Sequence, residues 1–252
     1  MVSKKKIVLI IVLILIVAIA ATGLMFYNNY QQGKASFQGK HNILVLCADP
    51  TEQREGVGGV DMAFIIELND GTLGEVTPVY PGGLYDPSMT PPPDLRSEGV
   101  DHWYLHDSLW TADLEAGTQR AQQIVEYNTG TSTDIVVVVT PDAIDAMINA
   151  VGPVYSNGQE VTIDSLTFLR NDQDQNGATR GDAVEGLADG IIDATRSSGK
   201  KVDLISTITD QYAKGNIMVV PQDVFEKLVA YAGFSNIFSW IYFDSWLLIF
   251  FL

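Results

Sequence analysis

Apolar runs alternate with polar loops along the chain, and this pattern predicts a set of strands. The run DIVVVVT is nearly continuous, as in strands that are buried on both faces of a sheet. Asn69-Asp70-Gly71 separates two apolar runs and predicts an antiparallel hairpin, and Asn157-Gly158 predicts a second, smaller hairpin. The main strands expected are residues 42–47, 61–68, 72–79, 134–140 and 217–220.

In the stretches between and after these strands, apolar residues recur at helical spacing. Pro141 and Pro221 each stand at the first position of such a stretch, where proline is well tolerated. The helices expected are residues 114–127, 141–151, 179–196, 201–214 and 221–231. Because strands alternate with helices, the fold expected is α/β, a three-layer α/β/α sandwich with a mixed sheet.

The N-terminal segment predicts a membrane anchor ahead of this domain. Residues 7–26 carry no charge and no proline, and a helix of that length spans about 30 Å of bilayer core. Lys4-Lys5-Lys6 precedes it, so residues 1–6 are expected in the cytoplasm and the main domain outside the cell membrane. A cleaved signal peptide is the competing interpretation.

The regions after the anchor differ sharply in polarity. Residues 27–40 are polar and read as a linker, followed by one domain over residues 41–235. Residues 236–252 are almost entirely aromatic and aliphatic, with one charge, Asp244. This apolar tail is interpreted as a truncated end or as a second membrane contact, since soluble domains seldom expose such a surface.

Composition narrows the function classes. The chain holds 31 acidic side chains against 15 Lys and Arg, a net charge of −16. Nucleic acid is therefore not an expected partner, because phosphate contacts need clustered cations. The single cysteine, Cys47, excludes an internal disulfide and a Cys-rich zinc site, and its place in a buried strand favours a core role.

Several motifs taken together resemble the LytR–CpsA–Psr family of cell-envelope proteins. They are the anchor, the strand that ends in Ala48-Asp49, the hairpin that opens at Gly59-Val60-Asp61, and Arg180 at the start of a helix. The segments Pro91-Pro92-Pro93-Asp94-Leu95-Arg96 and Trp103 to Trp110 are similar to an uncharacterised relative of that family in bacterial and archaeal envelopes.

The resemblance implies transfer of a glycopolymer from a polyprenyl-pyrophosphate carrier, with arginines and Mg²⁺ holding the pyrophosphate. It places Asp49 and Asp61 at the aspartate positions that bind Mg²⁺, and Arg180 at a phosphate-facing helix start. Three expected cation positions are glycine in this chain: Gly59, Gly82-Gly83 and Gly177. Two functions therefore stay open. The first is an envelope protein that transfers or binds a lipid-linked glycan. The second is an inactive binding or scaffold module in envelope assembly.

Two groups of side chains are candidates for this site. Asp49, Arg54 and Asp61 surround a glycine-rich loop at strand ends, where α/β folds build sites, and they are candidates for metal and phosphate contacts. An ion pair of Arg54 with a carboxylate that holds the loop is the alternative.

The second group is rich in aromatic residues. It combines Arg96, Trp103, Asp107 and Trp110, in which aromatic rings beside a carboxylate suit stacking on a sugar or an isoprenoid. Its alternative is a packed cap on the sheet with an Arg96–Asp107 ion pair. The nearby His102 and His106 are expected to be solvated, since a metal site needs a defined third ligand.

A third, weaker pattern concerns calcium. Asp172, Asp174 and Asn176 match positions 1, 3 and 5 of a calcium-binding loop, and Gly177 matches position 6. Ala183 stands where the bidentate Glu belongs. The motif therefore leaves open a weak Ca²⁺ site and a solvated acidic turn.

Overall fold

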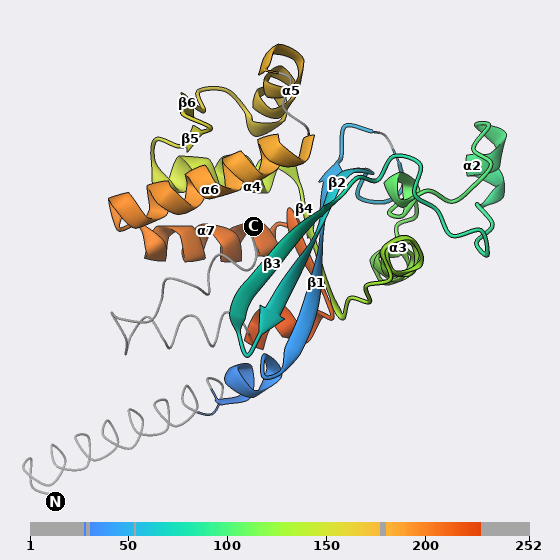
Figure 1. Cartoon of the computed structure of the whole chain (residues 1–252), viewed down its shortest axis with the longest axis horizontal. Helices are drawn as coiled ribbons and strands as arrows, with labels where there is room; N and C mark the ends of the chain where they lie inside the picture. The colour runs from blue at the N-terminus through green and yellow to red at the C-terminus, as the bar shows by residue number, and fades with distance from the viewer. Residues whose placement is uncertain (1–27, 29–30, 53, 177–179, 228–252) are drawn as a thin grey trace, which may run out of the picture.

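The core of the protein is a mixed five-stranded sheet. The computed structural model describes residues 28, 31–52, 54–176 and 180–227 (Figure 1). Strands β1 (Lys40–Asp49), β2 (Gly59–Asn69), β3 (Thr72–Val79), β4 (Ile135–Val139) and β7 (Ile217–Val220) form the sheet in the order β3-β2-β1-β4-β7. β1 and β4 are parallel, and the other neighbours are antiparallel. The predicted α/β class and mixed sheet are confirmed.

The hairpin between β2 and β3 has the tight turn that its sequence predicts. Asn69 pairs with Thr72, so only Asp70 and Gly71 form the loop. Both have positive φ, 49° and 75°, which is the conformation of the type I′ turn that matches strand twist. The turn fixes the register of β2, and through it the position of Asp61 near the other end of that strand.

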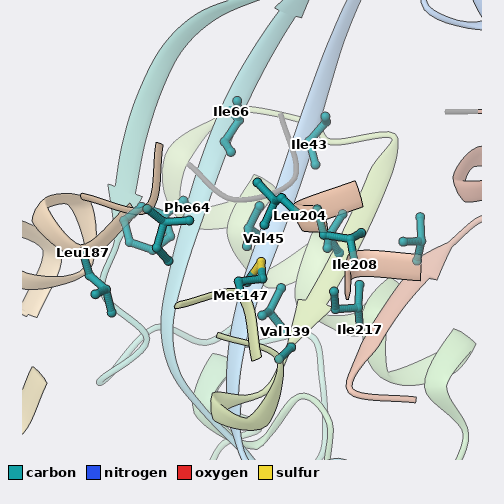
Figure 2. Packing of buried hydrophobic residues seen from close by; sticks show 14 of the residues in the cluster. Ile43, Val45, Phe64, Ile66, Val139, Met147, Leu187, Leu204, Ile208 and Ile217 are labelled. Atoms are coloured by element: carbon teal, nitrogen blue, oxygen red, sulfur yellow. The ribbon is translucent and has the colours of Figure 1, made fainter. Parts of the chain in front are cut away.

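Helices cover both faces of the sheet (Figure 1). Helices α4 (Pro141–Val151), α6 (Arg180–Ser198) and α7 (Lys201–Ala213) lie on one side, and α3 (Leu114–Thr129) lies on the other. Alternate residues of a strand face opposite sides, so β1 sends Ile43 and Val45 to the first helical layer and Leu44 and Leu46 to the second. Figure 2 shows the first of these two cores.

Continuous apolar strands produce this double core. In Figure 2, Met147 of α4 and Leu204 of α7 lie against Val45 of β1. All five residues of β4 are buried, because the strand is covered on both faces. The sheet is therefore a rigid base, and its strand ends hold the loops that carry the polar side chains described below.

Three elements depart from the predicted pattern. Helix α5 (Ser165–Asn176) occupies a stretch in which no helix was predicted, and its last turns replace the first half of the expected calcium loop. The proline-rich segment contains the short helix α2 (Pro93–Ser97), and a 3₁₀ turn, η1, spans Leu105–Asp107. The small hairpin of β5 (Tyr155–Ser156) and β6 (Gln159–Glu160) confirms the Asn157-Gly158 turn.

The predicted anchor of residues 7–26 and the apolar tail of residues 236–252 fall outside the described part of the chain. Within the described part, none of the helices combines the length and the apolar character needed to cross a bilayer. Anchoring by the N-terminal segment therefore stays a prediction.

Candidate functional site

The loop between β1 and β2 is held in place by its own polar groups. Asp49 ends β1 almost fully buried, and its Oδ1 accepts hydrogen bonds from the backbone N–H of Thr51 (2.8 Å) and from its hydroxyl (2.6 Å). Gly58 has φ 127°, and a Cβ there would overlap the carbonyl of Asp49. The backbone N–H of Gly56 donates to the carbonyl of Trp110 (3.0 Å), so the loop is fixed against the segment that follows η1.

Arg54 is the buried cation of this loop. Its side chain is 8% exposed, and Nη1 donates to Oδ1 of Asp107 at 2.7 Å. Nη2 donates to Oε2 of Glu52 at 2.6 Å. The guanidinium also lies over the ring of Trp110, 5.1 Å from its centroid. The Arg96–Asp107 ion pair, which belonged to one of the two interpretations of the aromatic block, is therefore wrong, because Asp107 accepts from Arg54. Arg54 instead forms the ion pair with a carboxylate that was the alternative for the loop.

His106 joins this network and is not simply solvated. Its Nδ1 lies 3.0 Å from the carbonyl oxygen of Val60, and because a carbonyl only accepts, Nδ1 carries a proton. Nε2 lies 3.0 Å from Nη2 of Arg54 and 3.1 Å from Oε2 of Glu52. In the neutral ring Nε2 accepts from Arg54. His102, by contrast, packs 4.0 Å from the ring of Tyr85.

Glu52, Asp61 and His106 converge beside this arginine. One ligand atom of each lies within 4.8 Å of the other two, and all three residues are half-buried. Asp49 is not in this group of described residues, so Mg²⁺ binding by Asp49 and Asp61 stays a prediction. Sequence reasoning missed Glu52 and His106 as members of the site. The sequence pointed to them only indirectly: Glu52 lies in the loop between β1 and β2, and His106 lies in the aromatic block, and both segments were candidates for the site.

The aromatic block packs as a cap on the sheet. Nε1 of Trp103 donates to the carbonyl of Asp107 (3.1 Å), and Arg120 lies 3.5 Å from the centroid of the Trp103 ring. Burial lowers the pKa of Arg120 to about 10, an effect that the nearby carboxylate of Asp113 opposes. Nε1 of Trp110 donates to Asp94 of α2 (2.7 Å). Each indole therefore already has one face against a guanidinium.

The remaining predicted residues lie apart from this network or outside the described side chains. Arg96 is exposed in the last turn of α2. Arg180 begins α6, as predicted, but α6 lies on the opposite side of the sheet from α2 (Figure 1). The side chains of Arg180, Asp172, Asp174 and Asn176 lie outside those described, so their phosphate and calcium roles stay predictions.

Cys47 faces the interior beside this site. Burial raises the pKa of its thiol to about 12, and the negative charge of Asp61 adds to the effect. A thiol in that state is a poor nucleophile. This agrees with the predicted core role.

A cavity of about 430 Å³ opens at the carboxyl ends of β1 and β4. Its polar lining includes Glu55, Thr140, Asp142 and Asn216. None of its described lining residues is Lys or Arg, so its charge is negative and unsuited to an anionic phosphate. Sequence analysis did not single out these four residues.

The fold is shared with solved structures of low sequence identity. The structure of gbs0355 from Streptococcus agalactiae superposes with a TM-score of 0.54 over 79% of this chain and 74% of that chain, at 14% sequence identity. TagV from B. subtilis gives a TM-score of 0.48 at 14% identity, over 77% of this chain and 80% of that chain. TagU from the same organism gives 0.46 at 14% identity, over 75% and 80%. At such identity the likeness to gbs0355 establishes the fold and no activity.

Sequence comparison places the chain more narrowly. Residues 38–173 match a family of proteins of unknown function, DUF4012, and the chain belongs to that family. The match includes β1, the loop with Arg54, the aromatic block and α4, and it therefore covers the whole of the network around Arg54. No curated protein sequence matches the chain significantly.

Proposed function

We propose that this chain is an extracytoplasmic protein of the cell envelope, held to the membrane by residues 7–26, that serves as a binding or scaffold module in envelope assembly. The fold that the chain shares with gbs0355 supports this proposal, together with the sequence resemblance to cell-envelope proteins. The predicted anchor and the lysines before it support the orientation. The envelope components that it would bind are glycopolymers or proteins that carry them.

The observation that carries this proposal is the pairing of Arg54. A pyrophosphate site without a phosphate-binding loop needs free guanidinium groups or a metal ion. Arg54 is the guanidinium beside Asp61, and Asp107 and Glu52 already accept from it at 2.7 and 2.6 Å. The guanidinium of Arg54 thus stands among three carboxylates, those of Glu52, Asp61 and Asp107. An anionic headgroup would meet a negative site.

A transferase is the second candidate function. The observation that favours it is the retention of Asp49 and Asp61 at the strand ends where the family resemblance places Mg²⁺ ligands. A divalent ion would offset the negative charge of the site and admit a polyprenyl-pyrophosphate-linked glycan. Arg180 would then supply the guanidinium that the glycine positions lack.

The two functions differ in ligand binding. We would measure the melting temperature of the full chain in detergent with a short polyprenyl pyrophosphate, with and without Mg²⁺, beside an Arg180→Ala variant. A ligand that binds only the folded state stabilises it by about 2.7 kcal/mol at a hundred times its dissociation constant. The binding-module proposal predicts no shift at saturating ligand.

A Mg²⁺-dependent rise that the Arg180→Ala variant loses would overturn the proposal in favour of the transferase. The binding-module proposal also predicts that the immobilised full chain retains purified envelope glycopolymer. Failure to retain glycopolymer, together with a pyrophosphate shift, would contradict the module. Orientation is tested separately with a phosphatase reporter fused to the C-terminus, which is active only outside the cytoplasm.

A further inference from the structure

We propose that Glu52, Asp61 and His106 form a binding site for one divalent transition-series cation, Zn²⁺ or Mn²⁺. This inference does not depend on the proposed function. It also differs in ligands and in metal from the Mg²⁺ site that the family resemblance implies, because two of its three ligands lie outside that pattern.

The three donors come from three separate segments and meet at one point. Glu52 lies in the loop after β1, Asp61 in β2 and His106 in η1. Their ligand atoms lie within 4.8 Å of one another. Two ligands of one ion stand at most about 4.4 Å apart, which is twice a bond of about 2.2 Å. Small side-chain rotations are therefore enough to bring all three into coordination distance.

The histidine is already in the tautomer that a metal needs. The carbonyl of Val60 accepts the Nδ1 proton of His106 at 3.0 Å, so Nε2 is the ring nitrogen that a metal ion would bind. A ligating histidine usually donates its other ring N–H in this way, and the bond fixes the orientation of the ring. Nε2 lies 3.1 Å from Oε2 of Glu52, so a metal ion between these two atoms would bind both.

The backbone leaves room for these ligands. A Cβ at position 59 would overlap the Glu52 carboxylate and lie 2.7 Å from Cε1 of His106. Glycine is thus the residue that allows Glu52 and His106 to stand side by side. The cation that the resemblance leads one to expect at position 59 would fill the same space.

Arg54 now supplies the positive charge between the two donors. Its Nη2 contacts Oε2 of Glu52 and Nε2 of His106 at 2.6 and 3.0 Å, so a metal ion would take the place of this one nitrogen. Nη1 would keep its bond to Asp107. The site therefore holds a positive charge in both states, either the guanidinium of Arg54 or a metal ion, and the metal ion competes with the guanidinium for the two donors.

The donor set selects the metal. Ca²⁺ and Mg²⁺ favour all-oxygen coordination, whereas an imidazole with two carboxylates suits Zn²⁺ or Mn²⁺. Three protein ligands leave at least one position for water or for an oxygen of a bound partner. The site would thus present a metal-bound water at the end of the β1–β2 loop.

Calorimetric titration of the metal-free full chain in detergent with Zn²⁺ tests this proposal, followed by X-ray absorption at the zinc edge. We expect one Zn²⁺ per chain and a spectrum with one imidazole. His106→Gln and Glu52→Gln should each weaken binding by at least about tenfold, the size of loss seen for lesser changes near metal ligands. His102→Gln is the matched control and should bind as the unchanged chain does, because His102 packs on Tyr85.

Glu52 is 38% exposed, so its variant tests the site even if His106→Gln fails to fold. Equal affinity in the unchanged chain and in Glu52→Gln would overturn the proposal. Absence of binding by a chain that melts cooperatively, or a zinc spectrum without imidazole, would also overturn it. The proposed function uses a different ligand in its own assay, so the two can fail separately.

Discussion

The Arg54–Asp107 ion pair should be a main source of stability for the site region, and Arg54→Met tests this. Methionine keeps the length of the apolar stem and removes the guanidinium. The two side chains are 8% and 9% exposed, and Nη1 lies 2.7 Å from Oδ1. Removing one partner of such a pair leaves the other as an uncompensated buried charge.

The expected loss in free energy of unfolding is about 4 kcal/mol. Breaking a buried ion pair costs about 3–5 kcal/mol. The second partner, Glu52, is 38% exposed, and solvent screening limits its share to below about 1 kcal/mol. The contact with the Trp110 ring at 5.1 Å adds about 0.5–1 kcal/mol.

Denaturant unfolding of the full chain in detergent, followed by tryptophan fluorescence, measures this loss. Arg196→Met is the matched control, because that arginine is 49% exposed and 3.8 Å from Asp193, and it should cost less than about 0.5 kcal/mol. Replacing both partners, Arg54→Met with Asp107→Leu, should recover at least about 2 kcal/mol of the single-variant loss. A loss below about 1 kcal/mol for Arg54→Met would refute the assignment of a buried pair.

Three further predictions concern single positions. Gly59→Ala should cost about 1–3 kcal/mol in unfolding experiments because its Cβ overlaps Glu52, whereas Gly82→Ala, with open space around it, should be near neutral. Burial raises the pKa of the Cys47 thiol to about 12, above its ordinary value near 9, so its contribution to the free energy of unfolding is complete below about pH 9 and is lost as the pH rises toward 12. The native chain should therefore resist thiol reagents at pH 9 that label the unfolded chain. Asp113→Ala removes the N-cap of α3, whose carboxylate accepts a backbone N–H at 3.0 Å, and should lower stability by about 1 kcal/mol without changing Zn²⁺ affinity.

The sheet could be predicted because its signals are local. The continuous apolar run of β4, the Asp70-Gly71 turn and Pro141 at the start of α4 each specify one element within a few residues. Helix α5 escaped prediction because its second half, NDQDQN, is entirely polar and shows no apolar periodicity. Its first half buries Phe168 in the main core, and this tertiary contact is not visible in the pattern.

The site could be predicted only in part because its contacts are distant in sequence. Asp49 and Asp61 follow from the strand ends, which the apolar pattern locates. The bond from Arg54 to Asp107 spans 53 positions, and the contact of His106 with Val60 spans 46. Which arginine meets Asp107 depends on how the β1–β2 loop folds against η1. Arg96 and Arg54 are equally plausible partners from composition alone, and only the packing of the loop selects Arg54.

The glycine at position 59 links the missing cation to the chemistry of the site. The family resemblance leads one to expect a guanidinium there, directed at an anionic headgroup. In this chain the space holds the carboxylate of Glu52 and the ring of His106, and the guanidinium of Arg54 is bound by carboxylates. With glycine in place of a cation at position 59, the charge at this point is negative, and the point attracts a cation where a guanidinium would attract an anion. The glycine thus makes room for the proposed metal ligands, and binding of the metal is measured independently of any pyrophosphate.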